Sequence, residues 1–198
     1  MSWLMFFSFA ICFLMGIPLA IVMGITGFAV ILAMGVPLEV VAQRMFTGID
    51  SFPLMAVPFF ILAGDLMNRG GTTIRIIGFA NSLVGHIRGG LAHACVVANM
   101  IFAGISGSSV ADASAIGSIM IPSMEKSGYE LDFSAALNSV AATIGPIIPP
   151  SIIMVIYGVS VNVSVGGLFA AGFLPGIMMG LALMFVVSRA AKKRNYPV

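Results

Sequence analysis

A single carboxylate in the middle of a long apolar run is the feature that most restricts how this chain can fold. Between residues 89 and 124 the only formally charged side chain is Asp112. A lone acid at membrane depth is unfavourable unless it is paired or faces a polar cavity. The run therefore predicts a membrane-embedded element that contains a polar site, and Asp112 is the first candidate for a functional residue.

The composition also indicates an integral membrane protein. Hydrophobic residues make up 60% of the 198 residues and charged residues only 8%, whereas an ordinary soluble domain has about 25% charged residues. The length suits an all-α protein with about five or six membrane-embedded segments. The net charge of +2 is too small to indicate a nucleic-acid partner.

Residues 89–127 predict a re-entrant helical hairpin. One full crossing takes about 20 residues, so this run suits two helices that each enter only part of the way. Its tip, between Gly104 and Asp112, consists of small residues and hydroxyls. Irregular backbone at membrane depth persists only where it is buried in protein or lines a wet cavity, so the tip is expected to bind a polar ligand. The alternatives are that the serines only permit close helix packing and that Asp112 only caps the second arm.

Residues 143–151 predict a second interruption. Three prolines and a glycine lie in this stretch, and prolines remove backbone donors and prevent a continuous helix. Residues 128–198 are therefore expected to form a broken helix followed by a last transmembrane span at 168–188. Two interrupted elements that meet near the midplane are typical of secondary transporters, in which helix N-termini hold anions and freed carbonyls hold a cation.

These two interruptions supply the candidate ligands. For an organic anion, the candidates are Ser106, Gly107, Ser108, Ser109 and Ser151. For Na⁺, which prefers oxygen ligands, the candidates are Ser106, Ser109, Asp112, Gly145, Ile147 and Pro149. We expect Na⁺ as the coupling ion and no organic cofactor. The sequence contains no His/Glu metal pair, Ser/His pairing or glycine-rich phosphate loop, so an enzyme is not expected.

Residues 1–88 are expected to form scaffold-type transmembrane helices and interfacial arm helices. Residues 2–38 carry no charge and suit either one long bent helix, which we favour, or two short segments divided at Pro18. Residues 39–51 indicate a loop or a short interfacial piece, and residues 51–67 a helix. Apolar residues recur at three- and four-residue steps between 72 and 88, which predicts a helix along the membrane surface.

The distribution of cations predicts the orientation. Both ends of a re-entrant hairpin face one side, and one crossing out and one back place the C-terminus on that side too. This side gathers Arg88, Lys126 and the four cations Arg189, Lys192, Lys193 and Arg194. The positive-inside rule makes it cytoplasmic.

Several segments resemble the large membrane subunit of tripartite ATP-independent periplasmic (TRAP) transporters. They are residues 104–122 and 142–151, together with 43–53, 58–64 and 85–91. The resemblance implies a sodium-driven importer subunit of elevator-type fold in the bacterial inner membrane. It also implies a small membrane subunit and a periplasmic binding protein as partners, and organic acids such as dicarboxylates, sialic acid or other sugar acids as substrates.

The length of the chain differs from that family. Its large subunit has two inverted repeats and is about twice as long, so residues 1–198 resemble the first repeat alone and the second repeat would be a missing partner. Three alternatives stay open: a membrane channel, since a re-entrant loop can also build a pore; another ion-coupled anion carrier of related fold; and a fragment that does not transport.

Overall fold

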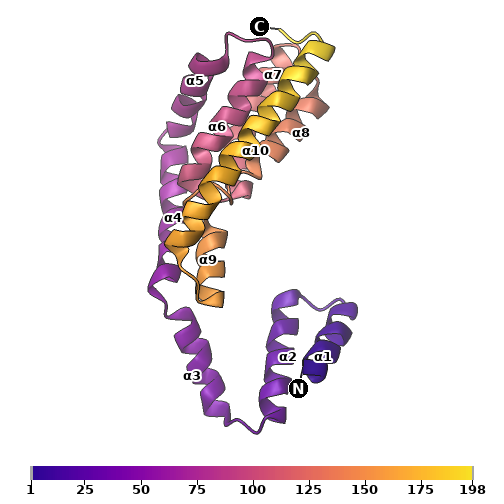
Figure 1. The fold of residues 1–198 in the computed structure, drawn as a ribbon, viewed down its shortest axis with the longest axis vertical. Helices are drawn as coiled ribbons and strands as arrows, with labels where there is room; N and C mark the ends of the chain where they lie inside the picture. Colours follow the sequence, from indigo (N-terminus) through magenta and orange to yellow (C-terminus); the bar gives the residue numbers. More distant parts are fainter. Residues whose placement is uncertain (1, 198) are drawn as a thin grey trace. The chain divides into compact units, whose positions relative to one another are not determined.

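The computed structural model describes residues 2–197, which form ten helices and no strand. The chain divides into two compact units, Met1–Ser51 and Phe52–Val198, whose helices are labelled in Figure 1. The all-helical prediction is confirmed for the described residues.

The first unit contains α1 (Ser2–Leu14), α2 (Leu19–Ala33) and α3 (Leu38–Ile49). α1 and α2 contact each other, so the favoured single bent helix is wrong and the alternative of two short helices is right. The physical reason is Gly16, whose φ of 75° lies in the left-handed region and turns the chain just before Pro18. Residues 39–49 belong to a helix, so of the two expected alternatives the loop is wrong, and the short interfacial piece stays a prediction.

The second unit holds the remaining helices: α4 (Phe52–Arg69), α5 (Thr72–Val84), α6 (Gly90–Ser106), α7 (Ser109–Lys126), α8 (Leu131–Ala142), α9 (Ile152–Val161) and α10 (Val165–Lys193). The helices expected at 51–67 and 72–88 are present as α4 and α5. Among the described residues, α10 is the one helix long and apolar enough to cross a membrane by itself. It contains the predicted last span.

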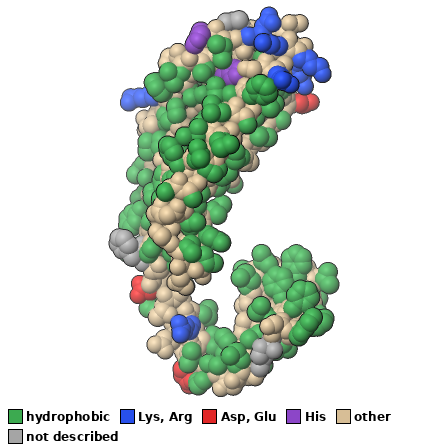
Figure 2. Space-filling model, viewed as in Figure 1, with side chains coloured by type: hydrophobic (Ala, Val, Ile, Leu, Met, Phe, Trp, Pro, Cys, Tyr) green, Lys and Arg blue, Asp and Glu red, His purple; other side chains and the backbone are tan. Residues whose placement is uncertain are grey.

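α6 lies at the centre of this unit and contacts α5, α7, α8 and α10 (Figure 1). Small side chains on α6, among them Ala92, Ala94 and Ala98, are fully buried, and such residues let neighbouring helices approach closely. Large apolar side chains such as Phe79, Phe173 and Phe185 remain exposed, and hydrophobic residues cover much of the visible surface in Figure 2. That distribution suits a protein surrounded by lipid.

The hairpin and the interruption occur at the predicted residues. α6 and α7 pack against each other and are joined only by Gly107 and Ser108. α8 ends at Ala142, turns occupy the following residues, and α9 begins at Ile152. That the hairpin is re-entrant, and that α8 and α9 form one broken transmembrane helix, stay predictions.

Candidate functional site

The tip of the hairpin is a tight reversal built by one glycine and one serine. Gly107 ends α6 with a φ of 59°, a left-handed conformation that glycine adopts without a side-chain clash. Ser108 then caps α7, because its Oγ accepts a hydrogen bond from the backbone N–H of Ala111 at 3.5 Å. The serine hydroxyl therefore has a structural task that the sequence prediction did not include.

The second interruption meets this tip directly. Ser151 is fully buried, and its Oγ caps α9 by accepting a hydrogen bond from the N–H of Met154 at 3.2 Å. The N–H of Ile152 donates to the carbonyl of Gly107 at 3.4 Å. A Cβ placed on Gly107 would lie only 2.6 Å from the carbonyl oxygen of Pro150. α7 and α9 thus begin side by side.

Asp112 lies where these two elements join. Its side chain is 0% exposed, Ser106 Oγ donates to its Oδ1, and its Oδ2 has no hydrogen-bond partner among the described residues. A Cβ on Gly145 would run into Oδ2, so the backbone of the second interruption packs against the carboxylate. The described residues place no cationic side chain within ion-pair distance of it. The ionised form of a carboxyl group in this state needs a positive ligand or positive dipoles nearby.

The other predicted cation ligands do not all face Asp112. The carbonyl of Pro149 faces Gly104, where a Cβ would lie 3.7 Å away. The carbonyl of Ile147 faces Gly172 on α10. Ser109 is the first residue of α7, and no hydrogen bond of its hydroxyl is found within the described part of the chain. The structure therefore brings Ser106, Asp112 and Gly145 together but turns Ile147 toward α10.

A pocket of about 620 Å³ opens beside the tip. Its walls come from α4 and from the hairpin, and its lining residues include Phe60, Asp65, Asn68, Ser106, Ser108 and Ser114. Asp65 is not free in it, because Arg69 Nε donates to Asp65 Oδ2 at 2.9 Å. Pockets for small organic ligands measure about 300–1,000 Å³ and are mostly apolar with a few polar groups, as this one is. The α4 wall was not expected from the sequence.

Two buried asparagines also escaped the sequence analysis. Asn138 on α8 donates from Nδ2 to the carbonyl of Ala113 at 2.9 Å, and Asn99 on α6 donates to Asn138 Oδ1 at 3.4 Å. The amide fits because position 117 is glycine, where a Cβ would lie 2.5 Å from Asn138 Nδ2. This pair holds the first turns of α7, and hence Asp112, against α6 and α8. The available signal was an amide in an apolar helix, which is unfavourable to bury without a partner.

The family model of the "Tripartite ATP-independent periplasmic transporter, DctM component" matches residues 6–198 of the chain. The chain belongs to this family. The chain is 44% identical over 198 residues to "Uncharacterized protein YgiK" of Salmonella typhimurium. This alignment covers 98% of the chain and 46% of that protein.

Two further relatives carry substrate names. The sialic acid TRAP transporter permease protein SiaT of Haemophilus influenzae is 48% identical over 159 residues, covering 80% of this chain and 26% of SiaT. The sialic acid TRAP transporter large permease protein SiaM of Vibrio cholerae is 50% identical over 155 residues, covering 78% of this chain and 36% of SiaM. The chain spans less than half the length of each of these three relatives. The family match confirms the resemblance to TRAP large membrane subunits that the sequence indicated.

Proposed function

We propose that this DctM-family chain forms one half of the membrane subunit of a sodium-driven secondary transporter that imports organic acid anions. The observation that carries the proposal is the buried carboxylate of Asp112, whose free Oδ2 faces the backbone at Gly145. Relatives named for sialic acid and C4-dicarboxylate transport support an acidic substrate.

The proposed cation site lies between the two interruptions. Na⁺ binds oxygen ligands, and a cation beside Oδ2 would neutralise a charge that no side chain of the described residues neutralises. Ser106, Asp112 and the backbone at Gly145 form the core of the proposed set. The Ser109 hydroxyl and the carbonyls of Ile147 and Pro149 are the remaining candidates. The carbonyl of Ile147 faces Gly172, so the backbone at Ile147 would have to move before it could bind the cation.

The proposed anion site uses the neighbouring helix starts. α7 and α9 begin next to each other, and the N-terminus of a helix offers free N–H groups and a positive dipole end. Ser106, Gly107, Ser108, Ser109 and Ser151 supply hydroxyl and backbone donors there. Neither interrupted segment contains Lys or Arg, so any arginine for the substrate comes from the rest of the transporter.

The membrane arrangement follows the family. Residues 89–127 form a re-entrant hairpin, α8 and α9 together form a broken transmembrane helix, and residues 1–88 provide scaffold and arm helices of an elevator-type inverted repeat. The protein lies in the bacterial inner membrane with the end of α10 in the cytoplasm. Its partners are the second repeat, a small TRAP membrane subunit and a periplasmic substrate-binding protein.

Sodium replacement tests this function. Uptake of the organic acid is measured in proteoliposomes that contain the complete transporter, with sodium replaced by choline at matched pH and membrane potential. Uptake should require the sodium gradient, and equal uptake in choline would refute the proposal. In parallel, sodium but not choline should raise the thermal unfolding midpoint of the chain in detergent.

A further inference from the structure

Five exposed cations surround the end of α10 and are not used by the proposed transport site. We call Arg88, Lys126, Arg189, Lys192 and Lys193 the basic rim. Cationic side chains gather at this end of the second unit in Figure 2. None of the five lies within 4.0 Å of a carboxylate of the described residues, where the ion pairs are Arg69–Asp65 and Arg194–Glu130.

Contacts between distant segments bring the basic rim together. The N–H of Gly89 donates to the carbonyl of Pro197 at 2.9 Å, and a Cβ on Gly89 would lie 2.6 Å from the Cβ of Ala191. Arg88 and Lys192 therefore flank one contact. Lys126 belongs to the same end, because the turn that follows it carries Tyr129, whose ring centroid lies 4.3 Å from that of Tyr196.

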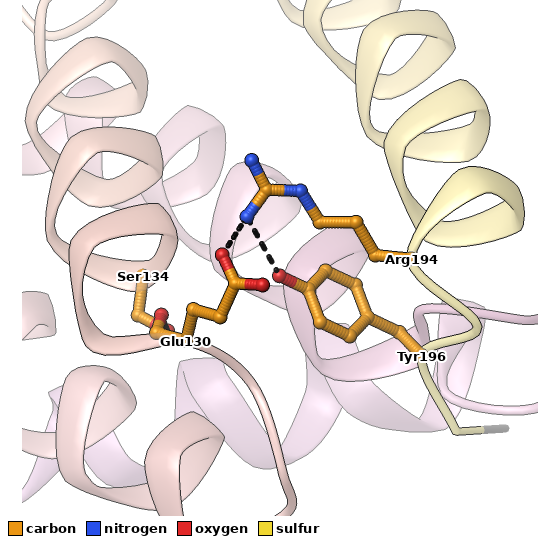
Figure 3. Close-up of polar contacts among 4 residues, drawn as sticks. All are labelled: Glu130, Ser134, Arg194 and Tyr196. Carbon is orange, nitrogen blue, oxygen red and sulfur yellow. Dashed lines mark hydrogen bonds and ion pairs between the residues drawn. The ribbon is translucent and has the colours of Figure 1, made fainter.

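The sixth cation of this end, Arg194, has a different task. Its Nη1 pairs with Glu130 and lies 3.5 Å from the hydroxyl of Tyr196 (Figure 3). Its guanidinium also lies over the ring of Phe133. This cluster fixes the tail after α10 against the start of α8, and it occupies the Glu130 carboxylate. Two exposed acids remain at this end, Glu125 and Asp132, so the five rim cations leave it with excess positive charge.

The basic rim lies at the level where lipid headgroups are expected. The uncharged stretch of α10 ends at Ser188 and the cations begin at Arg189. A span of about 20 apolar residues crosses the hydrocarbon core, and long cationic side chains just beyond it reach the interface. The guanidinium of Arg189 lies 4.6 Å from the centroid of the exposed Phe185 ring.

We propose that the basic rim binds the headgroup phosphates of anionic phospholipids. Lys and Arg form charge-assisted hydrogen bonds with phosphate oxygens, and the exposed apolar side chains next to the rim, such as Phe185 and Val186, contact the acyl chains of the same lipids. Each cation near an anionic bilayer surface raises the preference for it by about fivefold. Binding by several rim cations therefore selects phosphatidylglycerol over zwitterionic lipid of the same chain length.

Competition between two lipids tests the proposal. The chain is purified from mixed micelles with equimolar phosphatidylglycerol and phosphatidylcholine of identical acyl chains, and native mass spectrometry measures the ratio of bound lipids. The wild type should retain at least about fivefold more phosphatidylglycerol. The substitutions Arg189→Gln, Lys192→Gln and Lys193→Gln together should reduce this ratio toward one, and Arg88→Gln with Lys126→Gln should reduce it in part.

Matched controls separate the basic rim from charge in general. Arg44→Gln with Arg75→Gln removes exposed cations elsewhere and should keep the ratio, as should the charge-preserving Lys126→Arg with Lys192→Arg. If the triple variant does not fold, the wild type still decides the question, because its preference should fall when salt rises from 0.05 to about 0.5 M. An equal ratio in the wild type, a ratio unaffected by the rim variants or by salt, or displacement of the lipid by millimolar inorganic phosphate would each overturn the proposal.

Discussion

Replacing Gly107 by alanine should detach the hairpin tip from the second interruption. Gly107 combines a left-handed φ of 59° with a close backbone environment. A Cβ there would lie 2.6 Å from the oxygen of Pro150 and 3.1 Å from both the nitrogen of Ile152 and the Cα of Ser151. All three neighbours are backbone atoms, so no side chain can rotate away to make room.

The expected loss of stability has two parts. Holding a residue other than glycine in the left-handed region costs about 1–2 kcal/mol. Forcing a methyl group into a packed backbone contact costs about 1–3 kcal/mol. Gly107→Ala should therefore lower the free energy of unfolding by about 2–5 kcal/mol. Gly128→Ala is the matched control, because Gly128 also has a positive φ, 88°, but no atom within 4 Å of its Cβ position. It should lose only the first part.

The comparison is made by SDS titration of the purified variants in mixed micelles, followed by circular dichroism. Gly104→Ala provides a second control, since its Cβ would meet the oxygen of Pro149 at an ordinary 3.7 Å. Equal destabilisation by Gly107→Ala and Gly128→Ala would refute the contact between the tip and the interruption. The reasoning about the site would then fail with it, since that contact places α7 beside α9.

Three further predictions concern the residues around the tip. Asp112→Asn should abolish the sodium-dependent rise in the thermal unfolding midpoint while expression stays near wild type; a variant that fails to accumulate, with normal transport by the surviving protein, would show a structural carboxylate instead. Ser108→Ala with Ser109→Ala should raise the KM for the organic acid more than tenfold if both hydroxyls contact it, at about 1.5–3 kcal/mol for each bond to a charged group; an unchanged KM in uptake assays would assign the serines to packing. Gly117→Ala should displace the amide of Asn138 and lower the free energy of unfolding by about 1–3 kcal/mol in SDS titration, and a neutral result would mean that this amide is not clamped.

The hairpin and the second interruption could be predicted because local chemistry determines them. Gly107 and Ser108 form a reversal and a cap within a few residues, and the three prolines of 146–150 remove three backbone donors from one short stretch. These signals do not depend on the remainder of the fold. The same holds for α10, whose long uncharged stretch permits few alternatives.

The contacts between elements could not be predicted in this way. The sequence identified Gly145 as a candidate Na⁺ ligand through its carbonyl. Its lack of a side chain matters more, since it lets the backbone reach Asp112. The bond from Asn138 to Ala113 joins residues on different helices, and no periodicity in either helix specifies it. Of the two alternatives expected at 39–51, the loop failed for another reason: charged residues such as Glu39 and Arg44 are as common in a short amphipathic helix as in a loop.

The adjacency of the two helix starts determines how the charges at the tip add up. Each helix N-terminus carries the equivalent of about half a positive charge and each C-terminus about half a negative charge. The starts of α7 and α9 are therefore balanced by the ends of α6 and α8, which lie at the same junction, and with both ligand sites empty the negative charge of Asp112 remains. A sodium ion at the proposed site would cancel that charge, so that an organic anion at the helix starts would no longer be repelled by it. Each ligand should then bind more tightly when the other is present, and by thermodynamic linkage the two enhancements must be equal.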